Sequence, residues 1–149
     1  MQANTQIVQI AQIVKVSWQQ AENDLRAIRT PVFIDEQAVA PSFEWDEFDQ
    51  TAVHLLATYK NVPIACLRII DYRKIGRMAV LKAYRRNGLG AALLLEAVQI
   101  CKAHGSNTVH LSAQTHAIGF YEKCGFKVTS DIYQDVHIAH VDMQLELSF

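Results

Sequence analysis

The sequence YRRNGLGAALLLEAVQ, residues 84–99, joins two arginines and two glycines to a run of helix-forming alanine and leucine. Glycine is unfavourable in a helix, so Gly88 and Gly90 indicate a special backbone conformation or a close contact. The first turn of a helix carries unpaired N–H groups and a partial positive charge, which together bind phosphate. Arg85 and Arg86 add fixed positive charge beside it. The stretch therefore predicts a loop that holds an anionic diphosphate.

Two well-known phosphate-binding patterns do not fit this loop. The P-loop pattern GxxxxGK[ST] is absent, and GxGxxG fails because Gly88-Leu89-Gly90 is followed by Ala91, Ala92 and Leu93. The pattern that does fit is R-x-x-G-x-G, from Arg85 to Gly90.

Composition narrows the class of protein. The chain has 149 residues, a net charge of -1 and half of its residues apolar, which favours one globular domain over residues 1–149. The balanced charge gives no general attraction to nucleic acid or to acidic membranes. Its apolar runs fall short of the roughly 20 residues that span a bilayer, and the N-terminus lacks a secretory pattern. We therefore expect a cytoplasmic protein.

The hydrophobic pattern predicts a mixed α/β fold with a largely antiparallel first half. Strands are expected at 7–16, 52–59, 63–71, 74–81 and 109–113, with an antiparallel pair at 126–133 and 137–147. Lys60-Asn61 is the expected hairpin turn. Helices are expected after Ser17, after Pro31 as a short helix or turn, from Gly88 to a stop at Gly105, and over 116–125.

The loop and its neighbours resemble the GNAT superfamily of N-acetyltransferases. The resemblance rests on RMAVLKAYRRNGLG (77–90), QTHAIGFYEKCGFK (114–127), the segment 32–57 that begins VFIDEQ, and HIAHVDMQL (137–145). It implies a mixed, mostly antiparallel central sheet flanked by helices, in which the strands at 74–81 and 109–113 splay apart. His137 and Ala139 stand where similar proteins often have glycine and proline, so the last hairpin is expected to differ.

In that family the acyl-CoA lies in the splay, and the resemblance implies which residues would hold it here. Backbone groups of the strand at 74–81 would bind pantetheine, and one N–H would polarise the thioester carbonyl. The glycine loop would bind the diphosphate. The implied residues are Met78, Val80, Arg85, Arg86, Asn87, Gly88, Leu89, Gly90 and Ala91.

The resemblance also implies catalytic candidates. Tyr121, in the FYEK segment, is the expected general acid that protonates the leaving thiolate. The general base is left open between Glu36, which could equally pair with an arginine, His140, which could simply be hydrogen-bonded in its strand, and a water chain. No metal is expected, because the histidines and the three cysteines lack metal-ligand spacing.

An acidic run follows the VFIDEQ segment and allows two interpretations. Its carboxylates, Glu44, Asp46, Glu47 and Asp49, could attract a cationic amine, helped by the aromatic residues between them. A solvated surface is the commoner role of such a run, and we expect it here.

The leading interpretation is an N-acetyltransferase that moves an acetyl group from acetyl-CoA to a primary amine within a ternary complex. The acceptor would be a small-molecule or peptide amine, and a homodimer is possible through the exposed terminal hairpin. The alternative is a non-catalytic acyl-CoA-binding regulatory module on the same fold. A nucleic-acid-binding protein fits poorly, because only Arg85 and Arg86 cluster in the loop.

Overall fold

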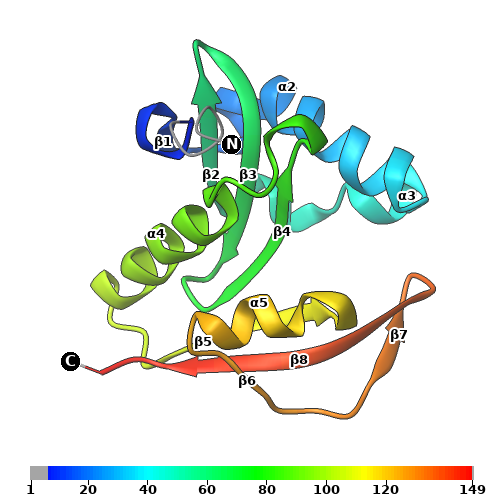
Figure 1. Ribbon diagram of the computed structural model, residues 1–149, viewed down its shortest axis with the longest axis vertical. Coiled ribbons are helices and arrows are strands. Elements are labelled where there is room, and N and C mark those ends of the chain that lie inside the picture. Colours follow the sequence, from blue (N-terminus) through cyan, green and yellow to red (C-terminus); the bar gives the residue numbers. More distant parts are fainter. Residues whose placement is uncertain (1–6, 149) are drawn as a thin grey trace.

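The computed structural model describes residues 7–148, which form a mixed sheet with helices on both faces (Figure 1). The strands are β1 (Gln12–Val16), β2 (Val53–Tyr59), β3 (Val62–Ile70), β4 (Lys74–Val80), β5 (Thr108–Gln114), β6 (Lys127–Val128), β7 (Tyr133–Asp135) and β8 (Ile138–Glu146). The helices are α2 (Trp18–Arg29), α3 (Pro41–Glu44), α4 (Leu89–Ala103) and α5 (Ile118–Lys123), with the π-helix η1 (Thr30–Glu36) and the 3-10 turns η2 (Glu47–Gln50), η3 (Lys82–Tyr84) and η4 (Thr115–Ala117). Among these described residues, no helix is long and apolar enough to cross a membrane.

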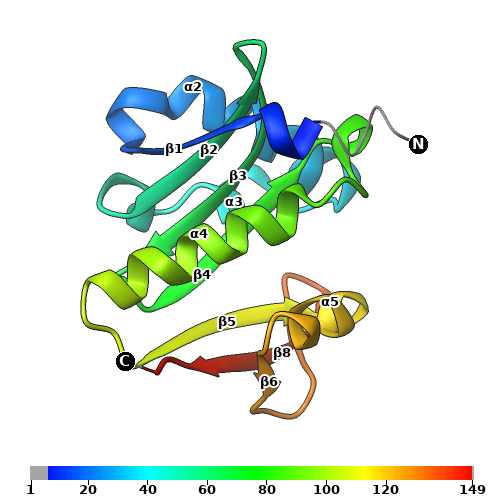
Figure 2. The same cartoon turned by 60° about the vertical axis from the view of Figure 1, so that its left-hand side comes forward.

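The sheet is split between its two central strands. Its strand order is β1-β2-β3-β4-β5-β8-β6, with β7 also paired to β8, and every pairing is antiparallel except that of β4 with β5. These two strands pair only at Lys74–His110 and Ile75–Leu111 and diverge beyond that point. The two halves of the sheet are seen apart in Figure 2. The predicted fold class, including the splay, is confirmed.

A bulge in β4 lies just beyond the point where the strands separate. Cys66 pairs with Ala79 and Arg68 with Gly76, so two residues of β4, Arg77 and Met78, face a single residue of β3. Arg77 has a φ of 46°, in the left-handed region that non-glycine residues rarely adopt. A bulge bends its strand and increases the local twist. This one therefore contributes to carrying β4 away from β5.

Apolar side chains on both faces of the sheet hold the helices in place. On one face, the buried α4 residues Leu89, Leu93, Leu94, Ala97 and Cys101 pack against Leu55, Leu67 and Leu111 of the sheet. On the other face, Leu25 and Ile28 of α2 pack against Leu56, Cys66 and Ala79. The alternation of Leu55 and Leu56 between the two clusters is the period-two pattern of a strand buried on both sides.

Local signals in the sequence set several element ends. Ser17 caps α2 in a capping box, its hydroxyl accepting from Gln20 N–H at 3.1 Å while the Gln20 side chain accepts from the Ser17 N–H. The expected hairpin turn is present, with φ values of 51° at Lys60 and 65° at Asn61. Gly105 and Gly125, with φ of 85° and 94°, follow α4 and α5 as expected.

Two expectations about strands are corrected. The strand predicted over 7–16 is only Gln12–Val16, and residues 7–10 are helical. The predicted terminal pair is not one hairpin, because β6 and β7 are separate short strands that both pair with β8. The segment from Pro31, expected as a short helix or turn, is the π-helix η1.

Candidate active site

The glycine loop enters α4 through left-handed backbone. Gly88 is the N-cap, with φ 88° and ψ 2°, and Arg86 has φ 64°. Asn87 is buried, and its Oδ1 accepts from the Leu89 N–H at 3.2 Å, so it shapes the turn. The N–H groups of Gly90 and Ala91 lie in the first helical turn, which has no intrahelical acceptors. They are thus available to an anion at the helix start.

The two arginines of the loop have different environments. Arg85 donates from Nε to the Val80 carbonyl at 2.8 Å and makes two bonds of 2.9 Å to the Glu36 carboxylate. Its guanidinium therefore ties β4 to η1. Arg86 is exposed beside Gly88. Of the two, Arg86 is the better placed to meet a ligand phosphate.

The edge of β4 that faces the split presents polar backbone groups. Leu81 N–H donates to the Ile64 carbonyl at 2.9 Å, so these two residues form a hydrogen-bonded pair across β3 and β4. Bonded and non-bonded pairs alternate in an antiparallel ladder, so the N–H and carbonyl of Val80 point away from β3. β5 has already diverged at this point, which leaves the Val80 N–H facing the split.

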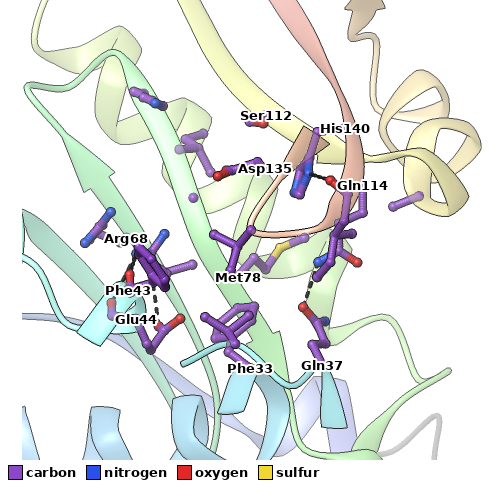
Figure 3. Close-up of a pocket in the computed structure, with 18 of the residues that line it drawn as sticks. Phe33, Gln37, Phe43, Glu44, Arg68, Met78, Ser112, Gln114, Asp135 and His140 are labelled. Atoms are coloured by element: carbon purple, nitrogen blue, oxygen red, sulfur yellow. Dashed lines mark hydrogen bonds and ion pairs between the residues drawn. The ribbon is translucent and has the colours of Figure 1, made fainter. Parts of the chain in front are cut away.

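A cavity of about 340 Å³ lies between the diverging strands (Figure 3). Phe43, Glu44 and Arg68 form one wall, Ser112, Gln114, Asp135 and His140 form the opposite side, and Met78 lines the cavity between them. Tyr121 and Phe120 of α5 also line it. Across the cavity, Gln114 Nε2 donates to Gln37 Oε1 at 2.7 Å, linking β5 to the segment after η1.

Tyr121 lies in an apolar part of the cavity wall. Its ring makes edge-to-face contacts with Phe120 and Phe126, at centroid distances of 5.1 and 6.1 Å. Burial raises the pKa of Tyr121 to about 12, with a further contribution from Cys124. The phenol is therefore protonated at neutral pH and can act as a hydrogen-bond donor in the cavity.

His140 lies in the cavity wall with a defined tautomer. Its Nδ1 is 2.7 Å from the Ile138 carbonyl oxygen, which can only accept, so Nδ1 carries a proton. In the neutral ring, Nε2 then holds the lone pair. The ring also stacks on Tyr133 at a centroid distance of 6.1 Å and an interplanar angle of 21°.

Glu36, the other candidate base, is engaged elsewhere. Its carboxylate accepts both hydrogen bonds from Arg85, and its side chain is 38% exposed. The structure thus places Met78, Tyr121 and His140 together around one cavity, while Glu36 is paired with Arg85.

Glu44 and Asp49 of the acidic run are buried, contrary to the expectation of a solvated surface, whereas Asp46 is partly exposed and Glu47 is exposed. We call the ion pairs here the arginine–carboxylate cluster, which consists of Arg29, Glu44, Asp46, Asp49, Arg68 and Arg77. Arg29 bonds Glu44 and Asp49 at 2.7 Å each, and all three are no more than 2% exposed. Glu44, Arg68 and Arg77 also line the cavity, so the cluster forms one of its walls.

Competing effects set the protonation of the cluster. Burial alone would raise the pKa of Asp49, but hydrogen bonds and charges from Arg29 and Arg68 outweigh it and lower that pKa. For Glu44, burial outweighs the charges of Arg77 and Arg29, and its pKa is raised. Burial would lower the pKa of Arg29, yet Asp49 and Glu44 raise it. Sequence reasoning missed this pairing, for which Arg68 within an apolar strand was the available signal.

The split mixed sheet, with a glycine loop and a helix start beside the split, defines an α/β fold of the acyl-CoA acyltransferase class. A family model for the acetyltransferase (GNAT) domain matches residues 19–147. The N-acetyltransferase YjcF of Bacillus subtilis (strain 168), itself uncharacterised, is 32% identical over 120 residues, which are 78% of this chain and 86% of YjcF. The chain therefore belongs to the GNAT acetyltransferase family.

Solved structures agree with this assignment. An acyl-CoA N-acyltransferase from Pseudomonas aeruginosa matches with a TM-score of 0.80 and 28% identity, over 91% of this chain and 99% of that one. A Bacillus subtilis acetyltransferase crystallised in complex with CoA matches with a TM-score of 0.71 and 17% identity, over 93% and 99% of the two chains. The second match, at its low identity, supports the fold alone.

Proposed function

We propose that this protein transfers an acetyl group from acetyl-CoA to a primary amine, by direct attack of the amine within a ternary complex. The observation that carries the proposal is that the Val80 N–H points away from β3, toward the side where β5 has diverged, two residues beyond Met78 of the cavity wall. An N–H at this point would bond the thioester oxygen as charge develops on it. The GNAT acetyltransferase family supports acetyl-CoA as the donor.

In the proposed reaction each nearby group has one task. The amine nitrogen attacks the thioester carbon, the C–S bond breaks, and the amide forms as CoA leaves. Val80 N–H stabilises the carbonyl oxygen, and the Tyr121 hydroxyl donates to the departing sulfur. Burial keeps Tyr121 protonated for that role. Holding both reactants in one cavity removes much of the entropic cost of bringing them together.

For the general base we favour His140 over Glu36. Because Nδ1–H of His140 is held by the Ile138 carbonyl, Nε2 is the ring nitrogen left to accept a proton. The carboxylate of Glu36 is already bonded twice to Arg85. We propose that the Glu36–Arg85 pair supports the CoA loop instead.

The test of this proposal is an acetyl-CoA turnover screen across primary amines, read as release of the free CoA thiol. Thiol release that depends on one class of amine, with acetylated amine as the product, is the expected result. The competing function is a non-catalytic acyl-CoA-binding module. Tight CoA binding without thiol release for any amine would favour that module and contradict the proposed transferase.

Arg86→Ala is expected to raise the Kd for CoA about tenfold, because it removes an exposed cation beside the helix start, a loss of about 1.4 kcal/mol. Calorimetric titration with CoA at low and high salt measures this, and the wild-type affinity should fall more steeply with salt. The matched control is Arg73→Ala, an exposed arginine just before β4, at the end far from the loop. Equal weakening by the two variants would exclude a specific phosphate contact by Arg86.

A further inference from the structure

The polar face of β5, β7 and β8 carries a chain of side chains that begins in the cavity and ends at the surface. Ser112 lies directly opposite Asp142 in the β5–β8 register, and Tyr133 lies opposite His140 in the β7–β8 register. The Tyr133 hydroxyl bonds both Ser112 Oγ and Asp142 Oδ1, the latter at 2.6 Å. Ser112 lines the cavity, whereas Asp142 is exposed.

The carboxylate of Asp142 sets the direction of the hydrogen bonds in this series of side chains. An ionised carboxylate can only accept, so the single proton of the Tyr133 hydroxyl is donated to Asp142. The Ser112 hydroxyl must then be the donor to the Tyr133 oxygen. A lone pair of Ser112 Oγ is consequently left for a donor in the cavity. All the hydrogen bonds run in one direction, from the cavity to the surface.

We propose that Ser112, Tyr133 and Asp142 form a proton relay that carries the proton lost by the acceptor amine out of the cavity. This inference rests on the proposed function. The N–H bond of the attacking amine breaks, and its proton passes to Ser112 Oγ either directly or by way of His140. The Ser112 proton moves to the Tyr133 oxygen, and the Tyr133 proton moves to Asp142 Oδ1. Asp142 then releases one proton to water, and rotation of the two hydroxyls resets the chain.

The surroundings of Tyr133 suit this role. The titratable groups that face it are His140 on β8, Asp135 in β7 and Asp142. Burial, the hydrogen bond to Asp142 and the nearby carboxylates raise the pKa of Tyr133, so it keeps its proton between transfers. The relay receives the proton either from the amine directly or from His140, which lines the cavity and whose ring stacks on that of Tyr133.

The decisive variant is Asp142→Asn, which keeps an oxygen that accepts from Tyr133 but removes the group that takes up the proton. We expect it to lower kcat at neutral pH at least about tenfold, as loss of a proton-transfer group does. Tyr133→Phe, which interrupts the chain, should have the same effect. The KM for acetyl-CoA and the melting temperature should change little for Asp142→Asn. The matched control is Asp131→Asn, which changes an exposed aspartate that is not part of the relay.

The pH dependence separates a relay from a structural contact. Without the relay the proton must leave to hydroxide or buffer, so the ratio of wild-type to variant turnover should shrink as the pH rises. Ser112→Thr, which keeps the hydroxyl, should retain more turnover than Ser112→Ala. Full turnover in Asp142→Asn, or a loss that is equal at every pH, would overturn the relay. If the wild-type protein released no CoA thiol with any amine, the proposed function itself would be refuted.

Discussion

Tyr121→Phe is expected to lower kcat about 100- to 1,000-fold, while the Kd for acetyl-CoA stays within about twofold of wild type. A donor aimed at developing charge in a site that excludes water contributes about 3–4 kcal/mol to the transition state, which corresponds to that factor. Phenylalanine keeps the ring contacts with Phe120 and Phe126. The substitution therefore removes the hydroxyl with little change in packing.

The pKa of Tyr121 defines what its hydroxyl can do. A phenol with a pKa of about 12 is a weaker acid than a typical thiol near about 8.5. Full transfer of its proton to a free thiolate is therefore unfavourable. Tyr121 would instead stabilise the departing sulfur by a hydrogen bond while a proton arrives from elsewhere. On the basic side, its own ionisation should not limit the rate until the pH approaches about 12.

Single-turnover kinetics and equilibrium binding of acetyl-CoA are the measurements. The matched control is Tyr59→Phe, a half-buried tyrosine of β2 whose ring packs near Tyr84. That variant should keep wild-type turnover. If Tyr121→Phe also kept it, the assignment of Tyr121 to the leaving group would be wrong. A matching loss of acetyl-CoA affinity would indicate a binding role in its place.

The sequence was most informative where structure depends on neighbours along the chain. The cap at Ser17 and the turns at Lys60-Asn61 and Gly105 follow from local backbone chemistry, and all three were predicted correctly. The last hairpin shows the limit of such signals. Its turn places Val136 and His137 at φ values of 47° and 55°, a region that the β-branched Val136 strongly disfavours. The pairing of β7 with β8 imposes these positive φ values, so the residues of the turn do not predict them.

The candidate site depends on contacts between distant residues, and there sequence reasoning reached only part of the answer. Glu36 precedes Gln37, which lines the cavity, but the Glu36 carboxylate is hydrogen-bonded to Arg85, which lies 49 positions later in the sequence. The acidic run has the composition of a solvated surface. Arg29 precedes Glu44 by 15 residues and Asp49 by 20, and only the fold brings them together. The relay likewise needs three strands to be in register before its three side chains can meet.

Arg29→Met should lower the free energy of unfolding by about 3–5 kcal/mol, because it leaves buried carboxylates with too few cations. Glu44 and Asp49 each lose a bond of 2.7 Å and remain no more than 2% exposed. For a chain of this size, each kcal/mol shifts the melting temperature by roughly 2–4 °C. A decrease on the order of 10 °C is therefore expected. Calorimetry and urea unfolding of both proteins measure it.

The control is Arg26→Met, the same substitution one helical turn earlier in α2. Arg26 also lies in α2, over the rings of Trp18 and Trp45, and it pairs with Glu22 at 2.8 Å, but its side chain is 40% exposed. An exposed pair four residues apart contributes about 0.3–0.5 kcal/mol, so Arg26→Met should cost well under about 1 kcal/mol from that pair. Similar losses in the two variants would show that packing on the tryptophans, rather than buried charge, accounts for the effect.

The pH dependence of the difference tests the electrostatic cause directly. In the wild type, Arg29 and Arg68 lower the pKa of Asp49, so this carboxylate stabilises the folded state above its unfolded pKa and loses that contribution as the pH falls through its folded pKa. In Arg29→Met, desolvation acts with less opposition and should raise the same pKa. The variant then gains stability by binding a proton. The difference in free energy of unfolding between the wild type and Arg29→Met should accordingly decrease below about pH 4, where an aspartate in an unfolded chain titrates. It should increase toward neutral pH. A gap that is constant across this range would contradict the role of uncompensated carboxylates.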